Sequence, residues 1–318
     1  MDPITFTPSY MERVGGGREL ELVYDRKLPK PDTPYGEAWE VVDRNGAQSV
    51  VDDGPWTGKS LHELWRNHRE ELFGSGFPDS ERFPILLKIL DARDVLSIQV
   101  HPPASLAATL GGEPKTEMWV IADCEPGARL YVGLKHGVDR PAFEQAIHDG
   151  SVAECVHSIT PQPGESIFIP SGRLHAIGAG FLIHEIQQNS DTTFRVFDWN
   201  RIGLDGKPRE LHVGPSLASI DYDDTDPAMD APDGPVLANC PHFKTERLHL
   251  APGTTADLAD PEHFAIFSIL EGVLRGGDGR RYGRGHSLLL PRQSLPPTAE
   301  STASVLRITL PTIPQAAG

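Results

Sequence analysis

The fold of this chain is decided by residues 163–178, which read PGESIFIPSGRLHAIG. The apolar run at residues 167–169 ends at Pro170, which predicts a short strand because proline cannot donate the next hydrogen bond of a sheet. A tight turn at Gly172 then reverses the chain. His175 follows this turn and can face back into the interior of a β-barrel, so we predict that it is a ligand.

The spacing of Gly164-x5-Pro170 recurs 121 residues later as Gly285-x5-Pro291. Each copy carries an apolar strand with a glycine turn, which predicts two similar barrels. The second copy continues without a histidine at the position that His175 takes in the first. We therefore expect the second barrel to lack the ligand.

A polar strand face is predicted at residues 96–102, LSIQVHP. Because side chains alternate along a strand, Ser97, Gln99 and His101 lie on one face. A lone strand histidine is more often structural, but this one stands two residues from an amide and could bind a divalent metal beside it. In the strand predicted at 116–121, Lys115 and Glu117 again share a face and could complete the site.

Length and charge narrow the class of protein. A chain of 318 residues favours two domains. The net charge of -16, from 29 basic and 45 acidic residues, argues against nucleic acid as a partner, so any anionic ligand must be held by a few local cations.

The sequence also predicts the cellular location of the protein. Cys124, Cys155 and Cys240 form no C-x-x-C pair, so neither a disulfide framework nor a thiolate zinc site is indicated. No export signal and no stretch of ~20 apolar residues is visible. We expect a cytoplasmic protein with no membrane partner.

Helices and a linker interrupt the predicted strands. Helical patterns occur at about 60–73, 103–110 and 139–150. The acidic, turn-rich stretch 221–235 is the best linker candidate, and we expect its charges to be solvated. This predicts a catalytic domain at 1–220 and a C-terminal domain at 236–318.

The motif from Gly164 to His175 resembles the second sequence motif of cupins, which are small metal-binding β-barrels. QVHP at 99–102, KTE at 115–117 and NSD-x3-R at 189–195 follow the order of type I mannose-6-phosphate isomerases of the short bacterial kind. The resemblance runs from Gly36 through the tail. It implies a mainly β fold of two cupin (jelly-roll) barrels with a few added helices, the second barrel degenerate and without metal.

The resemblance implies that one Zn²⁺ per chain is held by Gln99, His101, Glu117 and His175. Two imidazoles, a carboxylate and an amide oxygen suit zinc, and they leave manganese, iron or cobalt open. The implied reaction is the reversible isomerisation of mannose 6-phosphate and fructose 6-phosphate, with a proton moving through a cis-enediol.

Four further residues match catalytic positions of the family. Arg195 could stabilise enediolate charge. Lys115 could serve in acid–base chemistry or ring opening, or it could form an ordinary rim ion pair. Glu185 or Asp191 would move the proton or orient a hydroxyl, and the choice stays open. Long enzymes of the family have a histidine before the lysine, where this chain has Pro114.

Ser97, Lys88 and Arg201 match the phosphate-binding positions. Lys88 interrupts the apolar run 84–91, so it must either reach the surface or meet an anion, and a phosphate dianion would be such a partner.

Two other functions stay open. The chain could be a metal-dependent cupin enzyme acting on another sugar phosphate or using iron as an oxygenase, or a non-catalytic sugar-binding or regulatory cupin. Arg195 and Lys115 favour catalysis on a hexose 6-phosphate, and a monomer and a homodimer both stay possible.

Overall fold

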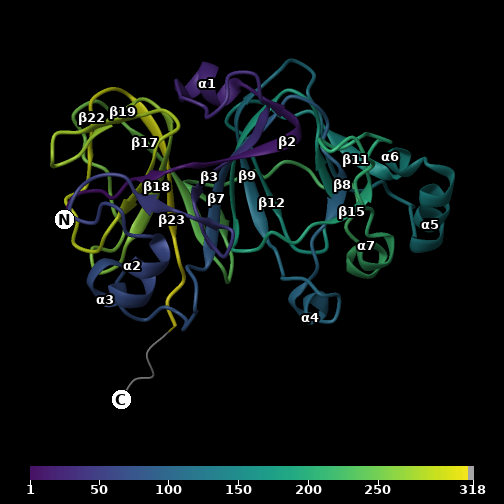
Figure 1. Ribbon diagram of the computed structural model, residues 1–318, viewed down its shortest axis with the longest axis horizontal. Helices are drawn as coiled ribbons and strands as arrows, with labels where there is room; N and C mark the ends of the chain where they lie inside the picture. The colour runs from purple at the N-terminus through teal and green to yellow at the C-terminus, as the bar shows by residue number, and fades with distance from the viewer. Residues whose placement is uncertain (314–318) are drawn as a thin grey trace. The chain divides into compact units, whose positions relative to one another are not determined.

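The structure is a computed structural model that describes residues 1–313 (Figure 1). Most of its regular elements are strands. The chain forms two compact units, a site unit of Tyr10–Ala38 and Lys88–Asp230, and a second unit of Met1–Ser9, Trp39–Leu87 and the chain from Ala231. The second unit thus combines three separate segments, and the predicted domain boundaries at 220 and 236 stay a prediction.

Two sheets build the site unit. The strands of the six-stranded sheet are, in order, β12 (Ser166–Ile169), β9 (Glu117–Cys124), β14 (Phe181–Gln188), β7 (Ile85–Ala92), β2 (Ser9–Gly17) and β3 (Tyr35–Val41). Those of the five-stranded sheet are β11 (Val156–Ile159), β10 (Leu130–Leu134), β13 (His175–Ile177), β8 (Ile98–Val100) and β15 (Phe194–Phe197). One apolar cluster joins the inner faces, with Trp119 and Ile167 from the first sheet and Leu130 and Val132 from the second. The fold is therefore mainly β, as predicted.

Short helices cover the outer faces of these sheets. Leu20 and Tyr24 of α1 (Glu19–Tyr24) pack on the six-stranded sheet. Phe143 of α5 (Arg140–Asp149) and Val152 of α6 (Val152–Cys155) pack on the five-stranded sheet, with Leu217 of α7 (Val213–Ser219). Helices occur at all three expected stretches but are shorter. They are α2 (Leu61–Asn67) and α3 (Arg69–Leu72), α4 (Ala104–Ala107), and α5.

The second unit has its own pair of sheets. One has the order β16 (Val236–Asn239), β17 (Lys244–Leu250), β23 (Ala303–Thr309), β18 (Ala265–Glu271) and β21 (Ser287–Leu290). The other has β20 (Arg281–Gly283), β19 (Val273–Arg275) and β22 (Thr298–Ala299). Two short ribbons complete it, β1 (Phe6–Thr7) with β6 (Val50–Val51), and β4 (Asp43–Arg44) with β5 (Ala47–Gln48). Phe267, Ile269, Leu274 and Tyr282 share one buried core between the two sheets.

Backbone hydrogen bonds confirm the predicted internal repeat. Gly164 N donates to Ile121 O and Ile121 N donates to Glu165 O, at 2.8 and 2.9 Å. The same reciprocal pair joins Ile269 to Gly285 and His286, at 2.8 and 3.0 Å. Both glycines have the positive φ that the turn requires, +91° and +84°. The first strand of each pair, β9 and β18, can therefore be aligned residue by residue.

This alignment shows which residues take the ligand positions in the second barrel. Glu117 is paired in register with Ile169, and the corresponding pair in the second unit is Ala265 with Leu290. Ala265 thus stands where the first barrel has a carboxylate. Pro296 stands at the repeat position of His175.

Residues 221–230 of the acidic stretch belong to the site unit. Asp224 O accepts from Leu134 N at 2.9 Å, and Arg173 donates to both carboxylate oxygens of Asp224 at 2.8 Å. Our expectation of a solvated charge run is wrong for Asp224, because a guanidinium lies within reach that the local sequence does not reveal. None of the helices within residues 1–313 is long and apolar enough to cross a membrane.

Candidate active site

Three neighbouring strands bring polar side chains to one place. His175 on β13 pairs in register with Gln99 on β8, which in turn pairs with Arg195 on β15. Residues directly opposite each other in adjacent strands point to the same face. The five-stranded sheet therefore presents His175, Gln99 and Arg195 side by side.

The six-stranded sheet faces them with a second row. Glu117 and Trp119 alternate along β9 and so share a face, and Lys115 precedes the strand by two residues. Glu185 on β14 lies opposite Trp119 in register. Residues far apart in the sequence thus meet in the space between two sheets.

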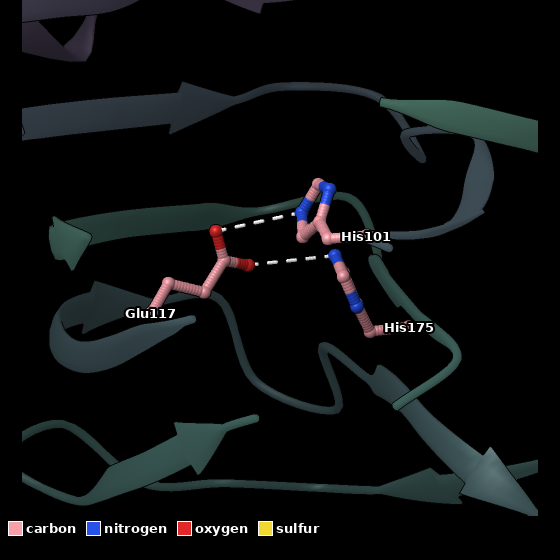
Figure 2. Close-up of side chains that lie close together, drawn as sticks. All are labelled: His101, Glu117 and His175. Atoms are coloured by element: carbon pink, nitrogen blue, oxygen red, sulfur yellow. Dashed lines mark ion pairs between the residues drawn. The ribbon is translucent and has the colours of Figure 1, made fainter. Parts of the chain in front are cut away.

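His101, Glu117 and His175 form a buried cluster (Figure 2). Their exposed fractions are 1%, 0% and 1%, and their candidate ligand atoms all lie within 4.8 Å of one another. Nε2 of His101 lies 3.5 Å from Glu117 Oε2, and Nε2 of His175 lies 3.4 Å from Glu117 Oε1. Two imidazoles and a carboxylate that converge in this way could hold a divalent cation.

The other ring nitrogens orient both imidazoles. His101 Nδ1 donates to Thr192 O at 2.8 Å, and His175 Nδ1 donates to Arg173 O at 2.9 Å. Because a carbonyl only accepts, the proton is on Nδ1, and Nε2 presents its lone pair to the cluster. Among the described residues nothing hydrogen-bonds His101 Nε2 or Glu117 Oε1, although both atoms are buried. Such orphaned acceptors fit a metal ion.

Gln99 lies beside this cluster. Its Nε2 is 3.3 Å from His175 Nε2, and its Oε1 accepts from Ser97 Oγ at 3.4 Å. The amide assignment of a glutamine can be exchanged without moving its atoms, which would turn the oxygen toward the cluster. The structure thus places the fourth predicted ligand next to the other three.

The environment keeps the cluster in the protonation state that metal ligands need. Burial, with a contribution from Lys115, lowers the pKa of His101 to about 3, and burial also lowers the pKa of His175. Burial opposes ionisation of Glu117, but Lys115 and the two imidazoles outweigh it and hold the pKa of that carboxyl well below its usual range. The imidazoles are neutral and the carboxylate is charged at neutral pH.

Basic and acidic side chains alternate away from the cluster, in the order Glu117, Lys115, Glu185, Lys88, Glu37 and Arg13. The successive nitrogen–oxygen distances are 2.7, 3.9, 3.2, 3.7 and 2.9 Å. Lys88 is buried and meets two carboxylates, so it does not reach the surface. These carboxylates outweigh burial and raise the pKa of Lys88, whereas burial and then Glu117 raise the pKa of Glu185.

A cavity of about 430 Å³ adjoins these groups, and Ser97, Lys88, Gln99, Lys115 and His175 line it. Glu185, Asp191 and Arg195 also line it, so the structure brings together most of the predicted site residues.

One end of the cavity has an excess of positive charge. Arg195 donates to Ser97 Oγ at 3.3 Å and to Glu210 O at 2.9 Å, and no carboxylate within residues 1–313 forms an ion pair with it. Arg209 and Arg201 share one carboxylate, that of Asp198. Burial and then Arg209 lower the pKa of Arg195, as expected where cations crowd together.

Arg201 does not line the cavity. Its guanidinium contacts Val95 O, Asp198 and Asp94 instead, with 2.7 Å to Asp198 Oδ1. Arg209 lines the cavity, and we did not predict it because it lies in an irregular stretch between β15 and α7. The lining residues Arg13, Glu37 and Trp119 were also missed, although the alternation of charged and apolar residues in their strands could have indicated a polar face.

Fold and site together define a cupin-fold protein with a buried histidine–glutamate metal site and a cavity suited to an anionic ligand. Residues 7–117 match the family model for the catalytic domain of type I phosphomannose isomerase. The mannose-6-phosphate isomerase ManA of Bacillus subtilis is 34% identical over 302 residues, which are 91% of this chain and 93% of ManA.

Solved structures agree with the sequence comparisons. The crystal structure of the mannose 6-phosphate isomerase from Bacillus subtilis matches with a TM-score of 0.87 at 30% identity and covers 98% of this chain and 100% of its own. A mannose 6-phosphate isomerase bound with zinc and yttrium matches with a TM-score of 0.73 at 17% identity, over 97% of this chain and 99% of its own, which shows the shared fold.

The chain belongs to the type I mannose-6-phosphate isomerase family. It is an isomerase, and its substrate is a sugar phosphate.

Proposed function

We propose that this isomerase is zinc-dependent and interconverts mannose 6-phosphate and fructose 6-phosphate through a cis-enediol. The observation that carries the proposal is the buried cluster of His101, Glu117 and His175, in which His101 Nε2 and Glu117 Oε1 have no hydrogen-bond partner among the described residues. Gln99 would complete the ligand set. The zinc found in a structure of the same fold and the mixture of nitrogen and oxygen donors both support this metal.

When bound, the metal would act as a Lewis acid toward the sugar oxygens. The residues around it then have distinct duties. Lys115 lies between Glu117 and Glu185 and can donate to a sugar oxygen or assist ring opening. Arg195 pairs in register with Gln99, so its planar guanidinium can face the oxygens on which enediolate charge develops.

Glu185 is the better placed of the two candidate proton carriers. It is buried, it lines the cavity, and its raised pKa brings it closer to neutrality, where a general acid–base group works best. Asp191 also lines the cavity but is exposed. We assign proton transfer between C2 and C1 to Glu185 and the orientation of a hydroxyl group to Asp191.

The phosphate would bind at the positively charged end of the cavity. Ser97 and Arg209 line that end, and Arg209 is supported there by Asp198. We therefore add Arg209 to the earlier assignment of Ser97, Lys88 and Arg201, with Arg201 acting from outside the cavity through Asp198. The two carboxylates beside Lys88 favour a role for this lysine in holding Glu185 as well.

A coupled assay for fructose 6-phosphate tests the proposal, together with elemental analysis of the purified protein. We expect turnover of mannose 6-phosphate that is lost with a chelator and restored by Zn²⁺, and about one zinc per chain. Turnover that survives complete metal removal would contradict the proposal. Preference for a different aldose phosphate would also contradict it.

A further inference from the structure

We propose that Trp119 is a positioning residue for the isomerisation, whose indole N–H fixes the carboxylate of Glu185 in the orientation that proton transfer needs. The inference rests on the proposed role of Glu185 and goes beyond it, since it assigns a function to a side chain that does no chemistry itself.

The geometry of the contact is specific. Trp119 Nε1 donates to Glu185 Oε2 at 2.9 Å, and both side chains are buried. The other oxygen, Oε1, lies 3.2 Å from Lys88 Nζ and 3.9 Å from Lys115 Nζ. One oxygen is thus held by a neutral donor, while the other is directed at the two lysines. A hydrogen bond to one oxygen restricts rotation of the carboxylate, so the other oxygen keeps one position relative to the substrate.

The same indole also contacts the metal site. Its ring meets that of His175 edge to face, with centroids 5.4 Å apart and an interplanar angle of 80°. Trp119 is two residues from Glu117 on β9, so it shares a face with this ligand. The tryptophan therefore connects the position of Glu185 to that of the metal ligands through one rigid ring system.

The second barrel provides an internal comparison. The alignment that matches Ile121 with Ile269 places Phe267 at the position of Trp119. Trp119 pairs with Glu185 across the strands, and Phe267 pairs with Arg307. Where the carboxylate is absent, the indole N–H is absent too.

Phe267 is buried in the core of its unit, so a plain aromatic ring is enough to fill this position of the fold. Packing alone therefore does not require a tryptophan. The feature that distinguishes Trp119 from Phe267 is a hydrogen-bond donor, and that donor is directed at Glu185.

The first test is Trp119→Phe, with Trp65→Phe as the matched control. Trp65 is also buried and donates its indole N–H, to Ser80 O at 3.1 Å, but it does not line the cavity. We expect Trp119→Phe to keep its metal content and its KM within about threefold, while kcat falls by about 10- to 100-fold, the loss expected from a misplaced reacting group. The control should keep its kcat. An unchanged kcat in Trp119→Phe would overturn the proposal.

A second variant distinguishes the loss of the hydrogen bond from a folding defect. Benzothienylalanine at position 119 keeps the shape of the indole and replaces its N–H by sulfur. A fall in kcat similar to that of Trp119→Phe, with an unchanged melting temperature, supports the proposal. A wild-type kcat in this variant overturns it, since only the hydrogen bond has been removed.

Combination with Glu185→Gln shows whether Trp119 acts through the carboxylate. If it does, the double variant is no slower than Glu185→Gln alone, and a further fall of tenfold would contradict the mechanism. The two proposals fail in different ways. Wild-type protein without chelator-sensitive turnover refutes the proposed function, whereas normal wild-type turnover with an unaffected Trp119→Phe refutes only the positioning role.

Discussion

Lys115 Nζ lies 2.7 Å from Oε2 of Glu117, while Oε1 of the same carboxylate faces Nε2 of His175 at 3.4 Å. One buried carboxylate is thus shared between a lysine and the candidate metal site. Because an unpaired buried charge is costly, each partner helps to keep Glu117 ionised. The lysine is thereby held close to the candidate metal site.

Removal of either imidazole should abolish metal binding. We expect His101→Ala and His175→Ala to lose zinc and activity together, because each leaves two or three ligands for the ion. Elemental analysis measures the zinc content of each variant, and the coupled assay measures its activity on the same preparation. His286→Ala, an exposed histidine of the second unit, is the control and should retain both. Full metal content in a His175 variant would show that the cluster is not the metal site.

Arg195→Ala should separate catalysis from metal binding. The guanidinium contacts Ser97 and a backbone carbonyl rather than the histidines, so we expect an unchanged zinc content. The kcat should fall by about 100-fold or more, as when a transition-state donor is lost. Arg93→Ala serves as the control, since Arg93 is exposed and pairs with Glu125. Near-normal turnover in Arg195→Ala would refute the assignment.

Arg209→Ala and Arg201→Ala form a matched pair, because both arginines bind the carboxylate of Asp198. Only Arg209 lines the cavity. We expect its loss to raise the KM for mannose 6-phosphate by about 10- to 100-fold, which is the effect of a charge-assisted hydrogen bond of 1.5–3 kcal/mol. Arg201→Ala should raise KM less. A larger rise in KM for Arg201→Ala than for Arg209→Ala would show that Arg201 is the main phosphate-binding arginine.

Asp91 predicts a pH dependence of stability that is separate from catalysis. It is 1% exposed, and burial raises its pKa from 3.8 to about 6. The folded state binds this proton more tightly than the unfolded state does, so protonation of Asp91 contributes to the free energy of unfolding. This stabilising contribution is fully present below pH 3.8 and is lost as the pH rises through 6.

Asp91→Asn removes this dependence and keeps an oxygen that can accept from Glu19 N. Between pH 5 and pH 8 we expect the free energy of unfolding of the variant to improve relative to wild type by about 1.4 kcal/mol, one unit of pKa. Urea unfolding of both proteins at the two pH values measures this difference. Parallel pH profiles for the two proteins would show that Asp91 does not titrate as described.

The sequence predicted the structure best at tight turns, where a particular residue type is required. Gly164 and Gly285 mark turns that require positive φ, so the two-barrel repeat could be read without coordinates. His175 follows such a turn, which predicted that it faces the interior of a barrel, and the family resemblance implied that it is a ligand together with Glu117. Strand alternation placed Gln99 and His101 on the polar face of one segment.

What could not be predicted depends on pairing between distant strands. Lys88 meets Glu185 across 97 positions of sequence, and no local pattern indicates that contact. Arg209 lies outside regular structure, where periodicity carries no information. The attachment of Asp224 to Arg173 was missed for a similar reason, since an acidic run in a sequence does not reveal which cation it will meet.

The second barrel keeps a buried ion pair where the first has Lys88 with Glu185. Arg307 stands at the position of Glu185, and Glu246 on the neighbouring strand β17 lies 2.9 Å from it. The polarity is therefore reversed between two copies of one architecture. An ion pair between these strands is compatible with the fold in either orientation, but only one orientation leaves a carboxylate beside the candidate metal ligands. Adding ligands at Ala265 and Pro296 alone would not create a second centre of the proposed kind, because Arg307 would place a cation where the proposed mechanism has a proton carrier.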